Sequence, residues 1–287
     1  MLPAPTLNAH PQRPEAVAFA RRPGRYAYVI DCLTGSHPAR LNLPQGHHFY
    51  GHGCFSADGN HLFTTENDYE TARGMIDIWD VTQGYRRVGQ FDSGGIGPLE
   101  MLLRLDAPGL VAANGDIETH PDSGRAKLNL SSKHPNLSNL SFDGVLQQQM
   151  EPPAELHQNS IRHLAMRADG GVGFAMPWQG DLGDDVPIVD MFRPGTEPAL
   201  LGGDDPRPRN LKGYGGSIAL ARDGNSLAVS APRGGVAQIL DTATGSPHRK
   251  HRLADVCRLA PFASSFVAST GTGAIATLTD TDASRLS

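Results

Sequence analysis

The sequence predicts an all-β chain that folds as a β-propeller of six to seven four-stranded blades, with the first blade incomplete at the N-terminus. Three observations predict this class. The 287 residues include 33 glycines and 22 prolines, which favour many short strands joined by turns. Neither a sustained helical period nor an alternation of strands with helices is present. Two short strand-and-turn phrases recur along the chain.

The first phrase is an apolar strand, an Asp-Gly pair and a second apolar strand. Its copies are centred on Asp58, Asp169 and Asp223, and a degenerate copy is centred on Asp106. An Asp-Gly pair suits a tight turn in which the glycine takes a positive φ angle, and the flanking alternation suits a hairpin. The copies lie roughly 40 to 60 residues apart, which is typical of propeller blades rather than of solenoid repeats.

The second phrase is a strand that ends in Asp, followed by three turn residues and Gly. It occurs at 76–84 and at 238–245. Placed in order, the two phrases give four antiparallel strands, which is one blade. Because the N-terminal part starts within such a unit, we expect the first blade to be incomplete. We expect residues 1–287 to form a single propeller domain, and an open assembly or a β-sandwich is the alternative.

Charge and hydropathy exclude two classes of partner. The net charge is −5 and no block of Lys and Arg could follow a phosphate backbone, so we expect no nucleic-acid partner. No apolar run approaches the about 20 residues of a membrane-spanning helix, so we expect no membrane span. Residues 1–16 lack the apolar core of a signal peptide. The protein is therefore expected to be cytoplasmic, unless an export signal was removed or left out.

His48 and His52 are the first candidates for a functional site. They lie four residues apart in the glycine-rich stretch 46–53, before a predicted blade. Residues i and i+4 of an extended chain face the same side, so the two imidazoles could bind a metal ion or an anionic substrate. Glu66 and His163 complete the predicted metal-ligand set. Hydrogen bonds to neighbouring backbone groups are the competing explanation for both histidines.

Carboxylates and amides supply further candidates. Glu66, Asn67 and Asp68 lie near the end of an apolar strand. A carboxylate there could transfer protons or hold a ligand, and it could equally cap a turn. Glu100 lies in the loop before the next predicted blade.

A polar excursion at 116–139 interrupts the repeats. It follows Asn114 and contains His120, with several prolines, glycines and lysines nearby. Such a segment suits a lid or a plug of the propeller channel, and a solvated surface loop is an equally good interpretation.

Four candidates come from the second half of the chain. Arg162 and His163 immediately precede a strand, and an arginine beside a histidine suits a carboxylate or a phosphate. Tyr214 and Arg233 lie at the next blade. Because similar residues recur at equivalent blade positions, we predict one shared pocket at the mouth of the central channel. The predicted pocket residues are His48, His52, Glu66, Asn67, Asp68, Glu100, Asn114, His120, Arg162, His163, Tyr214 and Arg233.

Several long motifs resemble one bacterial family, DUF1513. They include GHHFYGHGCFSADG, TENDYE, NGDIETHPDSGRAKLNL, SIRHLA and SAPRGG, and the similarity extends from about Pro14 to Gly273. The resemblance implies a WD40-like or YVTN-like propeller without an established activity. It also implies export to the periplasm and genes beside imelysin-type and di-haem peroxidase-like genes linked to iron uptake. An imelysin-like or haem-peroxidase-like periplasmic protein is therefore the expected partner.

Two departures from the family pattern bear on these expectations. Members usually carry an export signal and further strands before the point where this chain begins. The family motif Gly-Pro-His-Glu is Gly-Pro-Leu-Glu here, with Leu99 at the histidine position before Glu100. A site that needs this imidazole would be weakened or lost.

Three functions are compatible with the sequence. The first is a periplasmic binding or accessory protein linked to iron uptake, with a polar pocket and a bound metal ion. The second is a lactonase-like hydrolase in which Glu66 or His163 acts as the base and Arg162 or Arg233 holds the oxyanion. The third is a protein-interaction scaffold. No nucleophile elbow, P-loop or dinucleotide-binding glycine motif occurs, so the sequence does not establish an enzyme.

Overall fold

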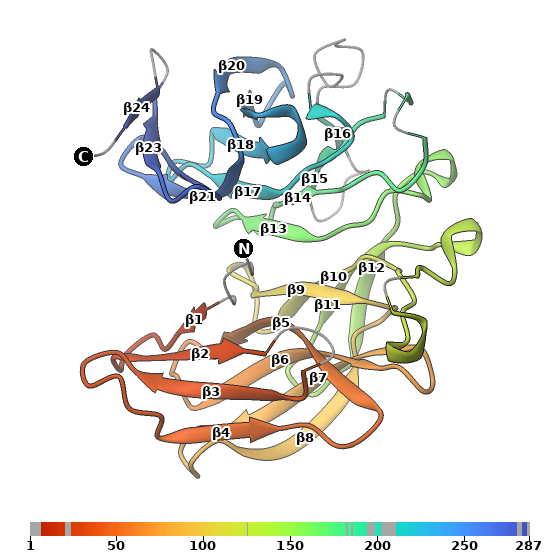
Figure 1. Cartoon of the computed structure of the whole chain (residues 1–287), viewed down its shortest axis with the longest axis vertical. Coiled ribbons are helices and arrows are strands. Elements are labelled where there is room, and N and C mark those ends of the chain that lie inside the picture. The colour runs from red at the N-terminus through yellow and green to blue at the C-terminus, as the bar shows by residue number, and fades with distance from the viewer. Residues whose placement is uncertain are drawn as a thin grey trace. The chain divides into compact units, whose positions relative to one another are not determined.

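The structure is a computed structural model, and it describes residues 7–20, 24–124, 126–181, 183–184, 186–193, 199–201, 211–279 and 283–285. These residues form six antiparallel sheets of four strands each, and consecutive strands are neighbours in every sheet (Figure 1). The other regular elements described are short 3-10 helices, and none of the described helices is long and apolar enough to cross a membrane. The prediction of an all-β chain built from four-stranded blades is confirmed.

Unit 1 is the first of two compact units, and it comprises Met1–Arg104 and Pro108–Glu151. Sheet 1 consists of β1 (Leu7–Ala9), β2 (Glu15–Phe19), β3 (Tyr26–Asp31) and β4 (Ala39–Asn42). Sheet 2 consists of β5 (His47–Phe55), β6 (His61–Asp68), β7 (Arg73–Asp80) and β8 (Arg86–Asp92). Sheet 3 consists of β9 (Pro98–Leu103), β10 (Leu110–Asn114), β11 (Asn136–Leu140) and β12 (Leu146–Met150).

Unit 2 comprises Leu105–Ala107 and Pro152–Ser287. Sheet 4 consists of β13 (His163–Met166), β14 (Val172–Ala175), β15 (Val189–Phe192) and β16 (Ala199–Leu200). Sheet 5 consists of β17 (Ser217–Leu220), β18 (Ser226–Ala231), β19 (Val236–Asp241) and β20 (Pro247–Arg252). Sheet 6 consists of β21 (Val256–Phe262), β22 (Ser265–Thr270), β23 (Ile275–Leu278) and β24 (Ala283–Arg285). A single domain over 1–287 stays a prediction.

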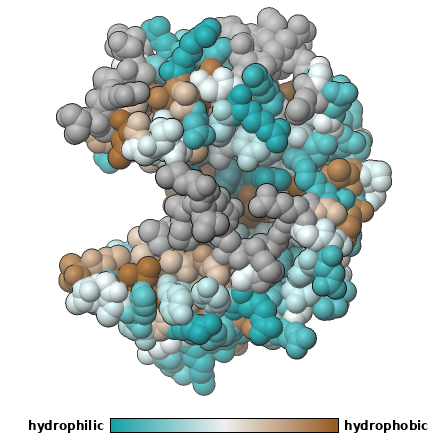
Figure 2. All heavy atoms as spheres, in the orientation of Figure 1, coloured by the Kyte–Doolittle hydropathy of each residue, from teal (hydrophilic) through white to brown (hydrophobic). Residues whose placement is uncertain are grey.

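Apolar side chains fill the space between neighbouring sheets of unit 1. Val17 and Trp79 belong to the core between sheets 1 and 2, and Phe63 and Met101 belong to the core between sheets 2 and 3. Strand β6 is consequently buried on both faces from its second to its seventh residue. Each fully buried side chain of this kind contributes about 1.5–3 kcal/mol. Figure 2 shows that the visible surface is largely hydrophilic, with small separate hydrophobic areas.

The predicted Asp-Gly turns form for the expected reason. In three copies the Asp accepts a hydrogen bond from the backbone N–H two residues further on, and the Gly takes a positive φ. These pairs are Asp58–Gly59, Asp169–Gly170 and Asp223–Gly224. In the second phrase, Asp80 and Asp241 each accept from the backbone N–H groups two and three residues further on. Local side-chain chemistry therefore ends these strands.

The first blade differs from the prediction. Strand β1 pairs with β2 in the register Leu7↔Ala18, so sheet 1 has four strands and is not incomplete. β1 has three residues, Leu-Asn-Ala, which are too few to show an alternation in the sequence. The six sheets correspond to the lower predicted number of blades.

Candidate functional site

Strand β5 carries three histidines and a bulge in its middle. The pairs with β6 are His48↔Asn67 and Phe49↔Glu66 before the bulge and Gly53↔Thr64 after it. Residues 50–52 therefore stand opposite one residue, Thr65, whose hydroxyl donates to the backbone oxygen of His52 at 3.1 Å. Gly51 takes a φ of 99° in the bulge, which a residue with a Cβ adopts only with strain.

His48 is fully buried and both of its ring nitrogens have protein partners. Nδ1 lies 3.0 Å from the backbone oxygen of Phe49, which can only accept, so Nδ1 carries the proton. Nε2 therefore accepts from the Asn67 amide at 3.2 Å. That amide also donates to the backbone oxygen of Thr119 at 3.3 Å, which ties the excursion to sheet 2. A metal ion bound to this imidazole would have to displace one of these hydrogen bonds.

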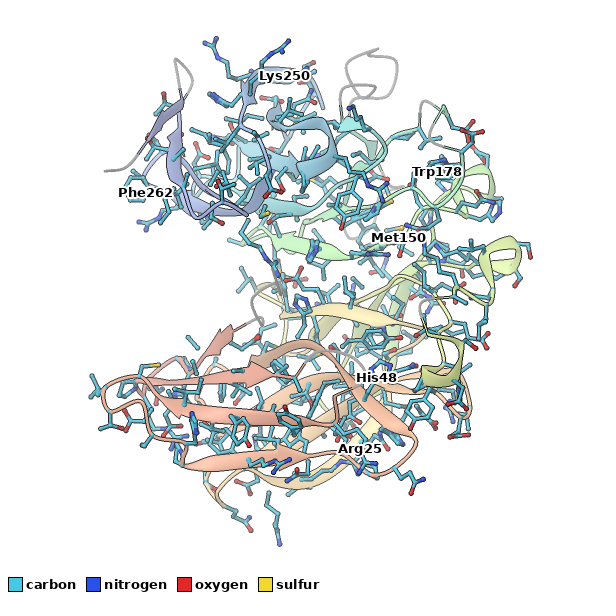
Figure 3. The ribbon with its side chains drawn as sticks, viewed as in Figure 1. Arg25, His48, Met150, Trp178, Lys250 and Phe262 are labelled. Carbon is cyan, nitrogen blue, oxygen red and sulfur yellow. The ribbon has the colours of Figure 1, made fainter. Side chains whose placement is uncertain are left out.

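The Asn67 amide belongs to an aromatic–imidazole cluster. We define this cluster as His48, Tyr50, Asn67, Tyr69 and His120. Tyr69 stacks on His48 with ring centroids 6.0 Å apart, and the Tyr69 and His120 rings meet edge to face at 5.2 Å. Tyr50 meets His48 edge to face at 5.3 Å. The cluster joins the start of β5, the end of β6 and the excursion, and Figure 3 labels His48 within it.

The excursion has its own internal hydrogen bonds. Asp116 accepts from the backbone N–H of His134, and the Asn129 side chain donates to the backbone oxygen of Asp116 at 3.2 Å. The Asn129 side-chain oxygen accepts from the Glu118 N–H at 2.8 Å. The described part of the segment is thus an ordered loop, and a role as a lid or channel plug stays a prediction.

His52 and Glu100 form a second pair in unit 1. His52 Nδ1 lies 3.6 Å from Glu100 Oε1, and their side chains are 8% and 18% exposed. The two residues come from β5 and from β9, the first strands of sheets 2 and 3. The two imidazoles contact different groups, since His48 bonds to Phe49 and Asn67 of sheet 2 and His52 lies beside Glu100 of sheet 3. Leu99 precedes Glu100 on the same strand.

Glu66 lies in a third environment, the core between sheets 1 and 2. Its side chain has no exposed surface, and neither carboxyl oxygen has a hydrogen-bond partner. Oε2 lies 3.3 Å from His47 Nδ1 and 4.0 Å from Arg87 Nη2. Arg87 is engaged with buried Asp77, whose Oδ1 lies 2.6 Å from Nη2 and whose Oδ2 contacts Nε.

The pKa of Glu66 is raised well above its ordinary value. Burial is the largest cause, and the neighbouring Asp77 carboxyl group adds to it, whereas the Arg87 charge opposes it. The raised pKa favours the protonated form of Glu66 beside the Asp77–Arg87 ion pair. Asp77, Arg87 and His47 are not among the residues predicted for the site. Asp77 could have been recognised, because it is an aspartate in the middle of the apolar strand Ile-Asp-Ile-Trp.

Two of the predicted pocket residues have structural hydrogen bonds. Asn114 donates through its amide to Ser93 O and Asn136 Oδ1 at 2.9 and 2.8 Å, and it accepts from the Ser93 hydroxyl at 2.8 Å. Asp68 accepts from the backbone N–H and the hydroxyl of Thr71, which caps the turn after β6. These hydrogen bonds account for the polar side chains of Asn114 and Asp68 at these positions without a ligand.

The remaining predicted residues lie in unit 2. Arg162 Nε donates to the Ser160 hydroxyl at 3.3 Å, and His163 begins β13. The Arg233 guanidinium carbon lies 4.7 Å from the centre of the Tyr214 ring, which is a cation–π contact. The structure thus brings Tyr214 and Arg233 together. One pocket shared by these residues and those of unit 1 stays a prediction.

Asp190 on β15 is a buried acid that is absent from the predicted site residues. Its Oδ1 accepts from the Met191 N–H at 2.7 Å, and its Oδ2 has no hydrogen-bond partner. Burial raises the pKa of Asp190 to about 7, and the Met191 hydrogen bond opposes this shift. An aspartate within the apolar run Ile-Val-Asp-Met-Phe was the signal in the sequence.

The metal-ligand prediction gains no support from the grouping of side chains. Across the part of the chain that the structure describes, no three His, Cys, Asp or Glu side chains are grouped so that they could hold a metal ion. A metal site on His48, His52, Glu66 and His163 stays a prediction. His48 is the residue whose hydrogen bonds oppose it most directly.

The family follows from a comparison with known families. The DUF1513 model, described as a protein of unknown function, matches residues 4–287. The chain belongs to the DUF1513 family. The resemblance seen in the sequence motifs is thereby confirmed. A search of curated proteins found no match to this DUF1513 chain.

Solved structures similar to this DUF1513 chain include a β-propeller domain. A chain of the mitotic checkpoint complex is 13% identical with a TM-score of 0.64, and the match covers 99% of this chain and 76% of that one. The propeller domain of Cps50 (Swd1) from Myceliophteria thermophila is 12% identical with a TM-score of 0.62, covering 100% and 86%. Hydrazine synthase from Kuenenia stuttgartiensis is 12% identical with a TM-score of 0.59, covering 96% of each chain. At these identities the likeness establishes the β-propeller fold alone.

Proposed function

We propose that the chain is a periplasmic accessory protein of an iron-uptake system that binds a partner protein through the aromatic–imidazole cluster. The observation that carries this proposal is the meeting of His48, Tyr69 and His120, which come from three separate segments. His48 is fully buried, whereas the His120 side chain is 29% exposed and Tyr69 is half-buried. The cluster therefore combines partly exposed aromatic rings with a buried His48 that hydrogen bonds hold in place.

Such an arrangement suits protein recognition. Aromatic side chains dominate binding energy at protein interfaces, because they bury a large area and lose few rotamers on binding. The Asn67 amide holds His48 and the excursion in place, so a partner would bind a surface that is already ordered. Propellers offer loops of this kind on a rigid scaffold.

The periplasmic location and the link to iron come from the family resemblance. The proposed partner is an imelysin-like or haem-peroxidase-like periplasmic protein. Because both ring nitrogens of His48 already have protein partners, the proposal assigns metal or haem chemistry to the partner rather than to this cluster.

A titration of the purified imelysin-like or haem-peroxidase-like protein into the labelled full chain tests this proposal. Tyr69→Ala combined with His120→Ala is expected to weaken binding by about tenfold or more. Tyr26→Ala is the matched control, because Tyr26 is an exposed tyrosine of sheet 1 with 40% of its surface accessible. Absence of any complex contradicts the proposal. Unchanged binding by the double variant instead assigns recognition to another surface of the scaffold.

The lactonase-like alternative gains no support from the geometry of Glu66. Its carboxyl group has no exposed surface, so a substrate would reach it only if the surrounding side chains moved. The other proposed base, His163, and the oxyanion partner Arg162 lie in unit 2. Turnover in a lactone screen that Glu66→Gln abolishes would restore this alternative.

A further inference from the structure

A groove of about 810 Å³ lies in unit 1 at the opposite end of the β5–β6 hairpin from the aromatic–imidazole cluster. It is bounded by the β5–β6 turn of sheet 2 and the β11–β12 turn of sheet 3, which can be followed in Figure 1. Phe63 and Phe142 stack in it with centroids 5.4 Å apart and ring planes at 17°. Phe142 keeps 39% of its surface exposed, and Ile78 adds further apolar area. Ligand pockets commonly have volumes of about 300–1,000 Å³ and aromatic walls.

Two carboxylates flank the aromatic pair. Asp58 accepts from the Ser56 hydroxyl at 2.6 Å and from the Asn60 N–H at 3.0 Å, and these bonds lower the pKa of Asp58. It is therefore ionised at neutral pH. Asp143 accepts from the Ser141 hydroxyl on the other side of the groove. Among the described residues that line the groove, none is Lys or Arg. An anionic rim over an aromatic wall suits a cation with an apolar stem.

The equivalent place in unit 2 contains a guanidinium group supplied by the chain itself. Arg167 follows β13 as Ser56 follows β5, and Asp169 corresponds to Asp58. Arg167 Nη1 donates to Gly224 O at 3.2 Å and to the Thr242 hydroxyl at 3.3 Å, which lie in two turns of sheet 5. Its Nη2 lies 3.0 Å from Asp169 Oδ2. The guanidinium thus bridges sheets 4 and 5 at their turns.

Two sequence differences distinguish the unit 1 groove from the place in unit 2 that the Arg167 guanidinium occupies. Ser56 stands where unit 2 has Arg167, so the guanidinium is missing while its carboxylate counterpart, Asp58, is kept. Phe142 stands where unit 2 has Thr242, so the hydroxyl acceptor is replaced by an exposed aromatic face. Both differences favour a cation that comes from outside the chain and stacks on a ring.

We infer that this groove binds an arginine side chain of a partner polypeptide, with the guanidinium between Asp58 and Asp143 and its stem against Phe142. The site is distinct from the aromatic–imidazole cluster and does not depend on the function proposed for it. The volume exceeds that of one side chain, so it leaves room for the neighbouring peptide backbone.

A titration of the full chain with acetyl-Gly-Arg-Gly-amide, followed by NMR chemical shifts, tests this inference. The citrulline peptide is the matched probe, because it keeps the shape of arginine and removes the charge. We expect saturable binding of the arginine peptide and binding weaker by about tenfold for the citrulline peptide. Asp58→Asn keeps the turn acceptor without the charge, and we expect it to reduce affinity by about threefold or more.

Ser56→Arg is the decisive variant, because it supplies the residue that unit 2 carries in the same turn. We expect its own guanidinium to occupy the groove and abolish binding of the arginine peptide, with an unchanged melting temperature showing that the chain is folded. Equal binding of the citrulline peptide, full binding by Ser56→Arg, or no saturable binding of the arginine peptide to the wild-type chain would each overturn the inference. Phe142→Ala, at an exposed position, provides a second variant with an expected loss of affinity.

Discussion

Each unit contains a buried acid with unsatisfied oxygens, and the surroundings of the two acids differ. Glu66 of unit 1 lies beside Asp77, Arg87 and His47, and both of its oxygens lack hydrogen-bond partners. Asp190 of unit 2 has one hydrogen bond, from a backbone N–H, and one unsatisfied oxygen. The pKa of Asp190 is raised by burial alone, whereas that of Glu66 is raised by burial and by a neighbouring acid. One acid therefore belongs to a charged network, and the other responds to pH independently.

The largest expected effect comes from removing the positive charge of that network. Arg87→Ala leaves Asp77 buried without its counter-charge, and we expect the free energy of unfolding to fall by about 3–5 kcal/mol. Urea unfolding at pH 7 measures this. Arg73→Ala is the control, because its ion pair with Asp92 has side chains 58% and 41% exposed. We expect that control to change stability by about 0.5 kcal/mol or less. Equal effects of the two variants would show that the Asp77–Arg87 pair behaves as a surface pair.

A second prediction concerns the pH dependence that Asp190 gives to unit 2. Its pKa in the folded chain, about 7, exceeds its ordinary value of 3.8. Stability from the retained proton is fully present below the unfolded pKa and is lost as pH rises through the folded pKa. We expect this loss to total roughly 2–4 kcal/mol, and Asp190→Asn to remove it. Unfolding free energies at pH 5 and pH 8 measure the slope. An unchanged slope in the variant would contradict the shift.

The smallest expected effect is that of Glu66→Gln. A glutamine has the shape of the protonated acid, so we expect the free energy of unfolding at pH 7 to change by about 1 kcal/mol or less. An ionised Glu66 held by its contacts with His47 and Arg87 would instead make this substitution costly, by about 2–3 kcal/mol. Thermal and urea unfolding of the variant distinguish the two states. The result decides whether the network of unit 1 carries one buried negative charge or two.

The parts of the fold that the sequence predicted depend on local chemistry. Asp58 and Asp80 stabilise their turns by accepting hydrogen bonds from N–H groups within three residues, so these turns were visible in the sequence. Strand β1 was missed because three residues show no period. The site was predicted less well, since partners such as Asp77 and Arg87 meet through strand register rather than through sequence proximity. Asp77 and Asp190 were detectable as acids in apolar runs, but their neighbours were not.

The bulge in β5 also explains why a periodic pattern can hide a change in structure. Because β5 gains two residues there relative to β6, an even number, Phe49 and Gly53 stay in phase with each other. The alternation of inward-facing and outward-facing residues in the sequence therefore continues across such a bulge without a break. Two residues can therefore be accommodated in this strand without exchanging its inner and outer faces, and the strand residues before and after the bulge keep their orientation.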